Sequence, residues 1–419
     1  MSLHEDSLNE ETVILGEPNG KPATSGVGGR ATLDDLFRRA ADRRPDAIAL
    51  IDPPNRSRFT DFPARSLTYA QADRAISAIA GRLHRIGLRS DAIIGLQLAN
   101  TVEFVLTFLA VLRAGMIAMP LPLLWRREDI INALSRAGGS AFIVSGRVGE
   151  HDQLDDALQA AVETFHIRAV CCFGQNVPDG VVSLSDLFTA EALDPLPPAE
   201  ERPYPPGAAA HLAAITWDVC ADGVIPVARS HAELAAGGLA VLLESRLQQD
   251  ATILSTLTMA SFAGLATALL PWLLVGGTLA LHHPFDPDAF IDQQSMVAPD
   301  AVVLPGPLVA PLTEAGSLTV GTGLSSVLAV WPAPDRLARA PAWRDTTTDM
   351  VDVQVFGEVG LIAARRSTGG RPGVVPFGPV AVPRGTKGGV IVGEVRATTN
   401  GTVAMRGPMV PRFAFPPGV

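Results

Sequence analysis

From about residue 47 to residue 304, short apolar runs alternate with amphipathic segments of helix length. Of all the features of the sequence, this alternation restricts the possible folds most. The clearest helix begins after Thr68, where Thr68 and Gln71 form a capping box, and it closes at Gly87. A strand-like run over residues 93–98 follows directly. Strands that alternate with helices in this way predict parallel pairing, with helices on both faces of each sheet.

The pattern changes after about residue 345, where short alternating runs such as residues 351–356 are separated by Gly and Pro. The sequence therefore predicts an α/β fold: two similar α/β layers with mostly parallel sheets packed together, plus a small β-rich, barrel-like lobe near the C-terminus. We expect a flexible arm over residues 1–30. The three subdomains are expected over residues 31–205, 206–345 and 346–419, with a proline-rich connector near 195–206.

Composition excludes several classes of protein. With 47% apolar residues in 419, the chain can bury a large core, so it is not a disordered polymer. The formal net charge is −10, and the only lysines are Lys21 and Lys387. An acidic chain without basic runs is poorly suited to bind a phosphate backbone, so we expect no nucleic-acid partner.

Cysteines and apolar runs bear on the compartment. Cys171, Cys172 and Cys220 are odd in number and lack metal-ligand spacing, which predicts reduced cysteines in a cytoplasmic protein. The acidic N-terminal residues do not resemble a secretory signal. Residues 253–281 carry no charge and are long enough to span a bilayer. Because Pro271 and the Gly276–Gly277 pair divide this run, we expect a buried core helix and a strand instead.

Several short motifs, in their order and spacing, resemble the large N-terminal domain of the adenylate-forming superfamily, which includes acyl-CoA synthetases, peptide-synthetase adenylation domains and luciferases. They are residues 44–49 (RPDAIA), 67–71 (LTYAQ), 95–100 (GLQLAN), 356–358 (FGE) and 406–410 (RGPMV). The resemblance runs from about Ala31 to the end of the chain. It implies that ATP and a carboxylate would give an acyl-adenylate and pyrophosphate, after which a thiol, usually coenzyme A, takes the acyl group.

Residues 218–229 correspond to the family's phosphate-binding loop, which has the form T-S-G-T-T-G-x-P-K-G. Backbone N–H groups, hydroxyls and a lysine in such a loop surround the phosphates. The corresponding positions here lack the hydroxyls and the lysine; they are Asp218, Val219, Cys220, Ala221, Asp222, Gly223, Pro226 and Arg229. Only Gly223 and Pro226 match the motif. The resemblance therefore implies a degenerate nucleotide-binding loop.

The side-chain charges expected at this loop are also negative, which is unfavourable for binding phosphate groups. Asp218 and Asp222 would repel a triphosphate by roughly a few kcal/mol in a partly desolvated site. Arg229 could replace the missing lysine, but an arginine at a helix entry is more often solvated, and we expect the solvated position.

Two further segments correspond to the family's adenine pocket. Its Gly-Gly-Ala-Pro turn is replaced by Trp331, Pro332, Ala333 and Pro334. The Trp331 indole either plugs the space for the base or is a core side chain at a strand end. The family's Tyr-Gly-x-Thr-Glu is reduced to Phe356, Gly357 and Glu358. Glu358 is either the retained magnesium ligand, which would make it the catalytic candidate, or a displaced surface carboxylate.

The sequence stops before the family's Thr-Gly-Asp element and its small C-terminal domain. That domain carries the lysine that stabilises the adenylation transition state, and neither Lys21 nor Lys387 can be matched to it. Loss of one preorganised donor costs about 10²–10³ in rate. The resemblance thus implies little or no adenylation by these residues alone.

The family's acyl pocket corresponds to Ser261, Phe262 and Gly264, with Ser261 where the family has a gating histidine. Small residues around Gly264 either leave an apolar tunnel or allow close helix packing, and we favour packing.

Two functional hypotheses follow. The first is a degenerate acyl-CoA synthetase-like homologue that acts as a ligand-binding, regulatory or complex-forming protein, with a carboxylate, acyl-CoA or nucleotide ligand. The second is a divergent acyl- or aryl-CoA ligase that uses ATP, Mg²⁺ and CoA and obtains its C-terminal domain from a separate protein partner. Neither hypothesis rests on a firm metal site or cofactor, and both are compatible with a homodimer.

Overall fold

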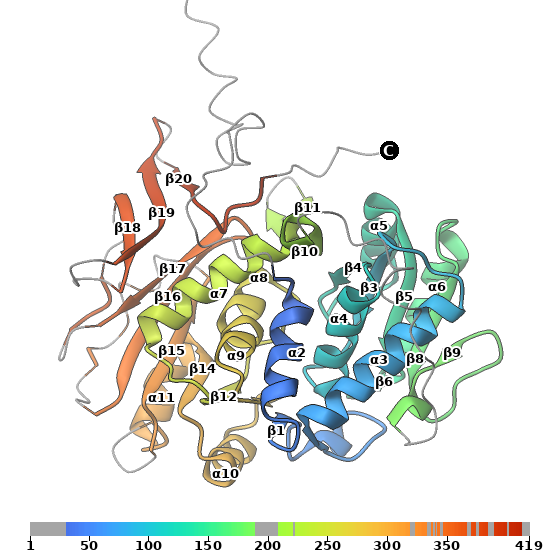
Figure 1. Ribbon diagram of the computed structural model, residues 1–419, viewed down its shortest axis with the longest axis horizontal. Coiled ribbons are helices and arrows are strands. Elements are labelled where there is room, and N and C mark those ends of the chain that lie inside the picture. The colour runs from blue at the N-terminus through green and yellow to red at the C-terminus, as the bar shows by residue number, and fades with distance from the viewer. Residues whose placement is uncertain are drawn as a thin grey trace, which may run out of the picture.

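The computed structural model describes most of the chain between residues 31 and 412 (Figure 1). The described residues are 31–188, 208–220, 223–318, 323–332, 337, 340, 342–343, 347–366, 370–373, 377–383, 389–399 and 402–412. The predicted N-terminal arm and the proline-rich connector lie outside them.

The larger sheet has eight strands in the order β17-β16-β15-β14-β12-β13-β1-β2. Their bounds are β1 Ile48–Ile51, β2 Ser66–Thr68, β12 Thr252–Ser255, β13 Thr278–Leu281, β14 Ala301–Pro305, β15 Ser326–Trp331, β16 Asp349–Phe356 and β17 Gly360–Arg365. All neighbours pair in parallel except the two edge strands β2 and β17, which are antiparallel.

The second sheet has seven strands in the order β11-β10-β4-β3-β5-β8-β9. They are β3 Ile93–Gln97, β4 Ile117–Pro120, β5 Gly139–Ser145, β8 Ala169–Phe173, β9 Val182–Ser183, β10 Leu212–Cys220 and β11 Gly223–Ser230. Only the edge strand β11 is antiparallel to its neighbour. Smaller sheets comprise β18 Gly378–Val382, β19 Val390–Ala397 and β20 Val403–Arg406, and the pair β6 Arg147–Val148 and β7 His151–Asp152.

Helices cover both faces of each large sheet. They are α2 Leu33–Arg43, α3 Tyr69–Arg85, α4 Val102–Arg113, α5 Arg127–Ala137, α6 Gln153–Glu163, α7 His231–Ser245, α8 Phe262–Gly264, α9 Leu270–Val275, α10 Pro287–Val297 and α11 Val309–Glu314. A π-helical segment, Leu265–Leu269, joins α8 to α9. Short 3₁₀ turns lie at Arg56–Arg58, Ser185–Phe188, Ala208–Ala210 and Gly306–Leu308.

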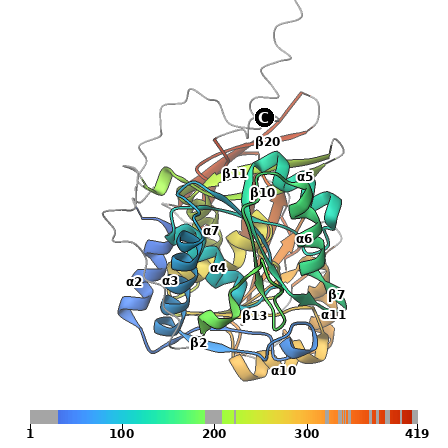
Figure 2. The ribbon, with the colours of Figure 1, turned by 90° about the vertical axis from the view of Figure 1, so that its right-hand side faces the viewer.

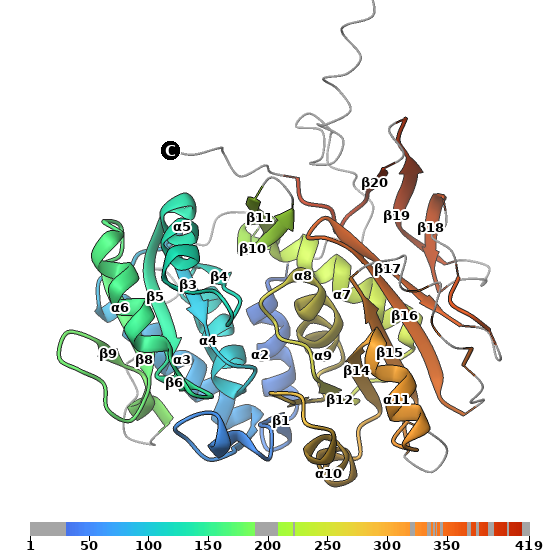
Figure 3. The ribbon, with the colours of Figure 1, turned by 180° about the vertical axis from the view of Figure 1, so that it is seen from behind.

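The layers are stacked as helix, sheet, helix, sheet, helix (Figures 1 and 3). Helices α2, α3, α4, α7 and α9 lie between the sheets and form the main hydrophobic core with the inner face of each. Helices α5 and α6 cover the outer face of the seven-stranded sheet, which Figure 2 shows from that side. Helices α10 and α11 cover the outer face of the eight-stranded sheet. The predicted fold class is confirmed.

The strands are not assigned to the two sheets in the order in which they occur along the chain. Strands β1 and β2 from the beginning of the chain join the eight-stranded sheet, and β10 and β11 join the seven-stranded sheet. We expected the run at residues 351–356 in the β-rich lobe, but it lies in β16, paired in parallel with β15. Burial explains the difference, because residues 351–355 are all buried, including the polar Asp352 and Gln354, so the strand is covered on both faces as in a parallel sheet.

Residues 253–281 form β12, a helix and β13, as expected for a core segment. Among the described residues, no helix combines the length and apolar character needed to cross a membrane. Cys171 and Cys172 are buried and free, and burial raises the pKa of each thiol to about 12. The side chain of Cys220 lies outside the described part of the chain.

The capping box expected at the start of α3 is present. The Thr68 hydroxyl accepts from the Gln71 N–H, and the Gln71 side chain accepts from the Thr68 N–H at 2.8 Å. Both bonds satisfy backbone donors that a helix N-terminus leaves without partners.

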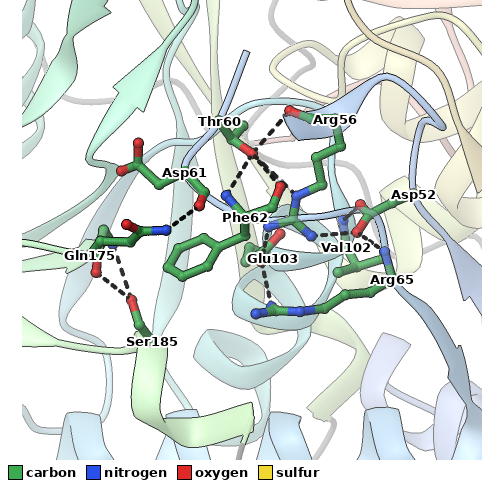
Figure 4. Close-up of polar contacts among 11 residues, drawn as sticks. Asp52, Arg56, Thr60, Asp61, Phe62, Arg65, Val102, Glu103, Gln175 and Ser185 are labelled. Carbon is green, nitrogen blue, oxygen red and sulfur yellow. Dashed lines mark hydrogen bonds and ion pairs between the residues drawn. The ribbon is translucent and has the colours of Figure 1, made fainter. Parts of the chain in front are cut away.

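A buried ionic cluster that the sequence did not predict holds the loop after β1 (Figure 4). The Arg56 guanidinium donates to the carboxylates of Asp52 and Glu103. Asp52 also accepts from the Val102 N–H at 2.9 Å, and Arg65 donates to Glu103 at 2.8 Å. The cluster therefore connects the end of β1 in one sheet to the start of α4, which follows a strand of the other.

Candidate functional site

The candidate site residues gather where the parallel strands β12, β14, β15 and β16 end. Parallel strands present their carboxyl ends at one edge, and ligands of open α/β sheets bind beside that edge. The β10–β11 hairpin of the other sheet lies against the same region, near α8 (Figure 1). The site is thus formed between edge elements of both sheets.

The segment expected to form a phosphate-binding loop is a β-hairpin. Asp218 pairs with Ile225, and Trp217 pairs with Pro226, so the strands continue almost to the turn. Val219 is largely exposed and Pro226 is buried. Ala221, Asp222 and the Cys220 side chain lie outside the described residues. The expectation of a loop over residues 218–229 is therefore wrong, because β-pairing from Leu212 with Ser230 to Cys220 with Gly223 makes this segment part of a hairpin.

Arg229 is buried, so the expectation of a solvated side chain is also wrong. Only 1% of the residue is exposed, and its guanidinium carbon lies 4.0 Å from the centre of the Phe262 ring. Nη1 donates to the Thr216 hydroxyl at 3.2 Å and lies 3.6 Å from a Glu358 carboxylate oxygen. Nε and Nη2 have no hydrogen-bond partner. Burial lowers the pKa of Arg229 to about 10, against the opposing effect of nearby carboxylates.

Glu358 lies in the turn between β16 and β17 and is 5% exposed. It is therefore not the surface carboxylate that one alternative expected. Both carboxylate oxygens accept from the Phe262 N–H, at 2.9 and 3.2 Å, at the start of α8. Burial raises the pKa of Glu358 to about 6, although Arg229 and the Phe262 N–H act in the opposite direction.

Asp218 faces the turn that carries Glu358. A Cβ atom placed on Gly357 would lie 2.7 Å from Asp218 Oδ1, and Gly357 has a φ of +49°. Glycine is therefore needed here both for the backbone conformation and for the close approach. The structure therefore places Asp218 and Glu358 close to one another and to Arg229.

The residues expected to form the adenine pocket do not lie together in one place. Trp331 is buried at the end of β15, where its ring lies over Gly306 and Nε1 donates to Asp352 at 2.9 Å. Asp352 is in turn paired with Arg366. Phe356 is half-buried against the main core, and Pro332 is exposed. Ala333 and Pro334 lie outside the described residues. The indole belongs to the core on the outer face of its sheet.

Comparison with known families assigns residues 37–357 to the family described as AMP-binding enzyme. This match covers well over half of the chain. The chain belongs to the AMP-binding enzyme family.

Curated members of the AMP-binding family match part of the chain. The medium-chain fatty-acid–CoA ligase of Escherichia coli (strain K12) is 30% identical over 28% of this chain and 19% of its own length. Long-chain fatty acid transport protein 1 of Bos taurus is 26% identical over 40% of this chain and 23% of its own length. The chain thus matches under a quarter of these relatives' length.

Solved structures agree on the AMP-binding fold. The apo structure of MbtA from Mycobacterium smegmatis has a TM-score of 0.69 at 22% identity, covering 92% of this chain and 68% of that one. A long-chain-fatty-acid-CoA ligase from Archaeoglobus fulgidus has a TM-score of 0.67 at 17% identity, covering 91% of this chain and 75% of that one.

The segment that corresponds to the AMP-binding family's acyl pocket is closely packed. The Ser261 hydroxyl accepts from the Gly264 N–H at 3.3 Å. A Cβ on Gly264 would lie 2.0 Å from the Thr258 carbonyl oxygen, and one on Gly237 would lie 2.5 Å from the Phe262 ring. Small residues here let α7 and α8 approach each other, and the Phe262 ring fills the space between Gly237 and Arg229.

Three further residues of the candidate site were not expected from the sequence. Thr216 binds Arg229, Gly237 accommodates Phe262, and Glu233 is a buried carboxylate whose charge acts on Arg229. Of the three, only Glu233 could have been singled out from the sequence, because Ser230 and Glu233 have the spacing of a capping box at a helix N-terminus. Its oxygens accept from the N–H groups of Ser230 and of Arg412 near the other end of the chain.

Proposed function

We propose that this chain is an acyl-CoA synthetase-like member of the AMP-binding family with little or no ATP-dependent adenylation of its own. It acts as a ligand-binding, regulatory or complex-forming protein. The observation that carries the proposal is the buried Arg229, which lies against Glu358 and Phe262 where the family resemblance places the nucleotide phosphates.

Electrostatics support the proposal. The charges of Asp218, Glu233 and Glu358 all act on one guanidinium. Two unit charges 4 Å apart interact by about 4 kcal/mol at an effective dielectric constant of 20, so three carboxylates disfavour a triphosphate by several kcal/mol. Arg229 and Arg412, whose Nε lies 3.8 Å from Glu233, offset only part of this, since two positive charges face three negative ones.

The oxygens of Glu358 also disfavour a magnesium ion. Both already accept from the Phe262 N–H and lie beside a cation. In the described part of the chain, no group of three or more His, Cys, Asp or Glu side chains is placed to hold a metal ion. The residues present thus do not fit a magnesium triphosphate, and we route no reaction step through one.

The proposed ligand is a carboxylate, an acyl-CoA or a nucleotide, the classes implied by the family and by its ligase relatives. A protein partner or a second copy of the chain could supply further residues. A cytoplasmic location remains part of the proposal.

Pyrophosphate exchange into ATP tests the proposal. The chain is assayed with Mg²⁺ and a panel of short, medium and long fatty acids and aryl carboxylates, beside the E. coli medium-chain ligase as positive control. We expect exchange at least 10³-fold below the control. Robust exchange by the chain alone would contradict the proposal. Thermal shift with ATP, AMP, CoA and acyl-CoAs then identifies the ligand class.

The second candidate is a divergent acyl- or aryl-CoA ligase completed by a separate C-terminal domain. One observation supports it: Glu358, which the resemblance offers as a retained metal ligand, is buried beside Arg229. Co-expression with a lysine-bearing C-terminal domain of a related ligase would then restore exchange, and the first proposal predicts that it does not.

A further inference from the structure

Arg229 is held in the site from several sides. Its backbone is fixed in β11, opposite Ala214 of β10. Its guanidinium contacts the Thr216 hydroxyl, the Phe262 ring and the Glu358 carboxylate. The side chain therefore cannot turn out of the site without losing all of these contacts.

Apart from the Phe262 ring, the groups near the guanidinium are oxygen ligands. Thr216 contributes a hydroxyl and Glu358 a carboxylate, and Asp218 points its carboxylate at the residue before Glu358. Carboxylate and hydroxyl oxygens are the donors that hard divalent cations such as Mg²⁺ and Mn²⁺ prefer. In the structure, the positive charge near these oxygens is the guanidinium of Arg229 and not a metal ion.

The hydrogen bonding of Arg229 is incomplete. Its Nε and Nη2 are buried and have no partner, and the contact with Glu358 is 3.6 Å long. A buried arginine that serves as a structural hydrogen-bond centre normally uses most of its five donors. Arg229 serves instead mainly as a positive charge next to carboxylates.

We infer that Arg229 is an internal cation that occupies the cation position beside Glu358, whose neighbour Gly357 lies against Asp218, and thereby excludes a divalent metal ion. The inference rests on the proposed function and gives a physical cause for it. The side chains of Arg229 and Phe262 fill the site. The site also lacks the hydroxyl and lysine donors that would bind phosphate groups. Removal of the positive charge alone is expected to leave the Asp218 carboxylate, the Thr216 hydroxyl and the remaining lone pairs of the Glu358 oxygens, which also accept from the Phe262 N–H, available to a metal.

The test measures Mn²⁺ binding by electron paramagnetic resonance of the free ion, with no nucleotide present. Wild type is compared with Arg229→Met, which keeps the volume and loses the charge, and with Arg229→Lys, which keeps the charge. Arg39→Met, at an exposed position of α2, is the matched control. We expect Arg229→Met to bind one Mn²⁺ at least tenfold more tightly than the other three proteins.

Two double variants locate the new site. Adding Glu358→Gln or Asp218→Asn to Arg229→Met should return Mn²⁺ binding to the wild-type level. The inference is overturned if folded Arg229→Met gains no site, or if wild type already binds Mn²⁺ in a way that Glu358→Gln abolishes. If Arg229→Met is unfolded without metal, millimolar Mn²⁺ should restore its near-ultraviolet circular dichroism, and failure to do so also overturns the inference.

The outcome is separable from that of the proposed function. Pyrophosphate exchange by wild type contradicts the function. Absence of a new Mn²⁺ site, with exchange still absent, contradicts only the role given to Arg229.

Discussion

The guanidinium of Arg229 lies 3.6 Å from the carboxylate of Glu358, and this contact joins the edge hairpins of the two large sheets. Arg229 belongs to the β10–β11 hairpin, and Glu358 lies in the turn of the β16–β17 hairpin. Both groups are buried, so each depends on the other to remain charged.

Arg229→Ala is expected to lower the free energy of unfolding by about 3 kcal/mol at pH 7.5, because it leaves Glu358 buried without its cation. The loss should be smaller at pH 5, where Glu358 can take up a proton. Urea unfolding at both pH values measures this loss of unfolding free energy. Arg39→Ala is the exposed control and should stay within about 0.5 kcal/mol of wild type. Equal stability of Arg229→Ala and wild type at pH 7.5 would show that the ion pair is dispensable.

Glu358 should make stability depend on pH between about 4.5 and 6. Burial raises its pKa from 4.5 to about 6, so the folded state binds the proton more tightly than the unfolded state. Its stabilising contribution is therefore complete below pH 4.5 and is lost as pH rises through about 6. The loss amounts to roughly 2 kcal/mol. Asp52, whose pKa is also raised to about 6, contributes in the same direction.

The pH effect is isolated by comparing wild type with Glu358→Gln in urea unfolding from pH 4.5 to 7.5. The contribution of Asp52 is common to both proteins and cancels. The wild-type curve should fall by up to about 2 kcal/mol relative to the variant. Parallel curves would contradict the assignment to Glu358.

Gly357→Ala should destabilise the protein by about 1–3 kcal/mol, since it forces a Cβ against Asp218 at a positive φ. Gly138→Ala is the matched control, because Gly138 has a φ of +70° with open space around it and bears only the backbone cost. In an Asp218→Ala background, the cost of Gly357→Ala should fall to that of the control. Thermal unfolding of the four combinations measures the coupling, and additive effects would mean that Asp218 does not crowd Gly357.

Arg56→Met should be among the most destabilising single changes, because it leaves Asp52 and Glu103 buried without their shared cation (Figure 4). We expect a loss of about 3–5 kcal/mol. Arg58→Met, two residues away at an exposed position, should change stability by less than about 0.5 kcal/mol. Urea unfolding of both variants is the measurement. A small effect at Arg56 would mean that the loop after β1 is held by other contacts.

Much of the fold could be predicted because its signals are local. The capping box at Thr68 and Gln71 and the apolar spacing after it define α3 within a single helix length. The core helix and strand expected within residues 253–281 are present, and the strand is β13. The π-helical turn at Leu265–Leu269 has no comparable local signal and was not predicted.

The candidate site was predicted less well. The resemblance assigned Asp218 and Arg229 to a phosphate-binding loop and Glu358 to a separate segment, and Arg229 was expected in solvent. In the structure Asp218 and Arg229 lie in a hairpin, and Arg229 is buried beside Glu358. Pairing of β10 with β11 and packing of Phe262 against Gly237 determine those details. Both depend on residues that are distant in the chain or lie on the opposite strand.

The sequence by itself therefore determined the alternation of strands and helices, the loss of the lysine and hydroxyl donors from the phosphate segment, and the family resemblance. Periodicity, caps and residue identities are properties of neighbouring positions. Only the tertiary structure decided which sheet each strand joins and that Arg229 is buried as the partner of Glu358. Burial and ion pairing arise when segments far apart in the chain exclude water together, and no local pattern records that.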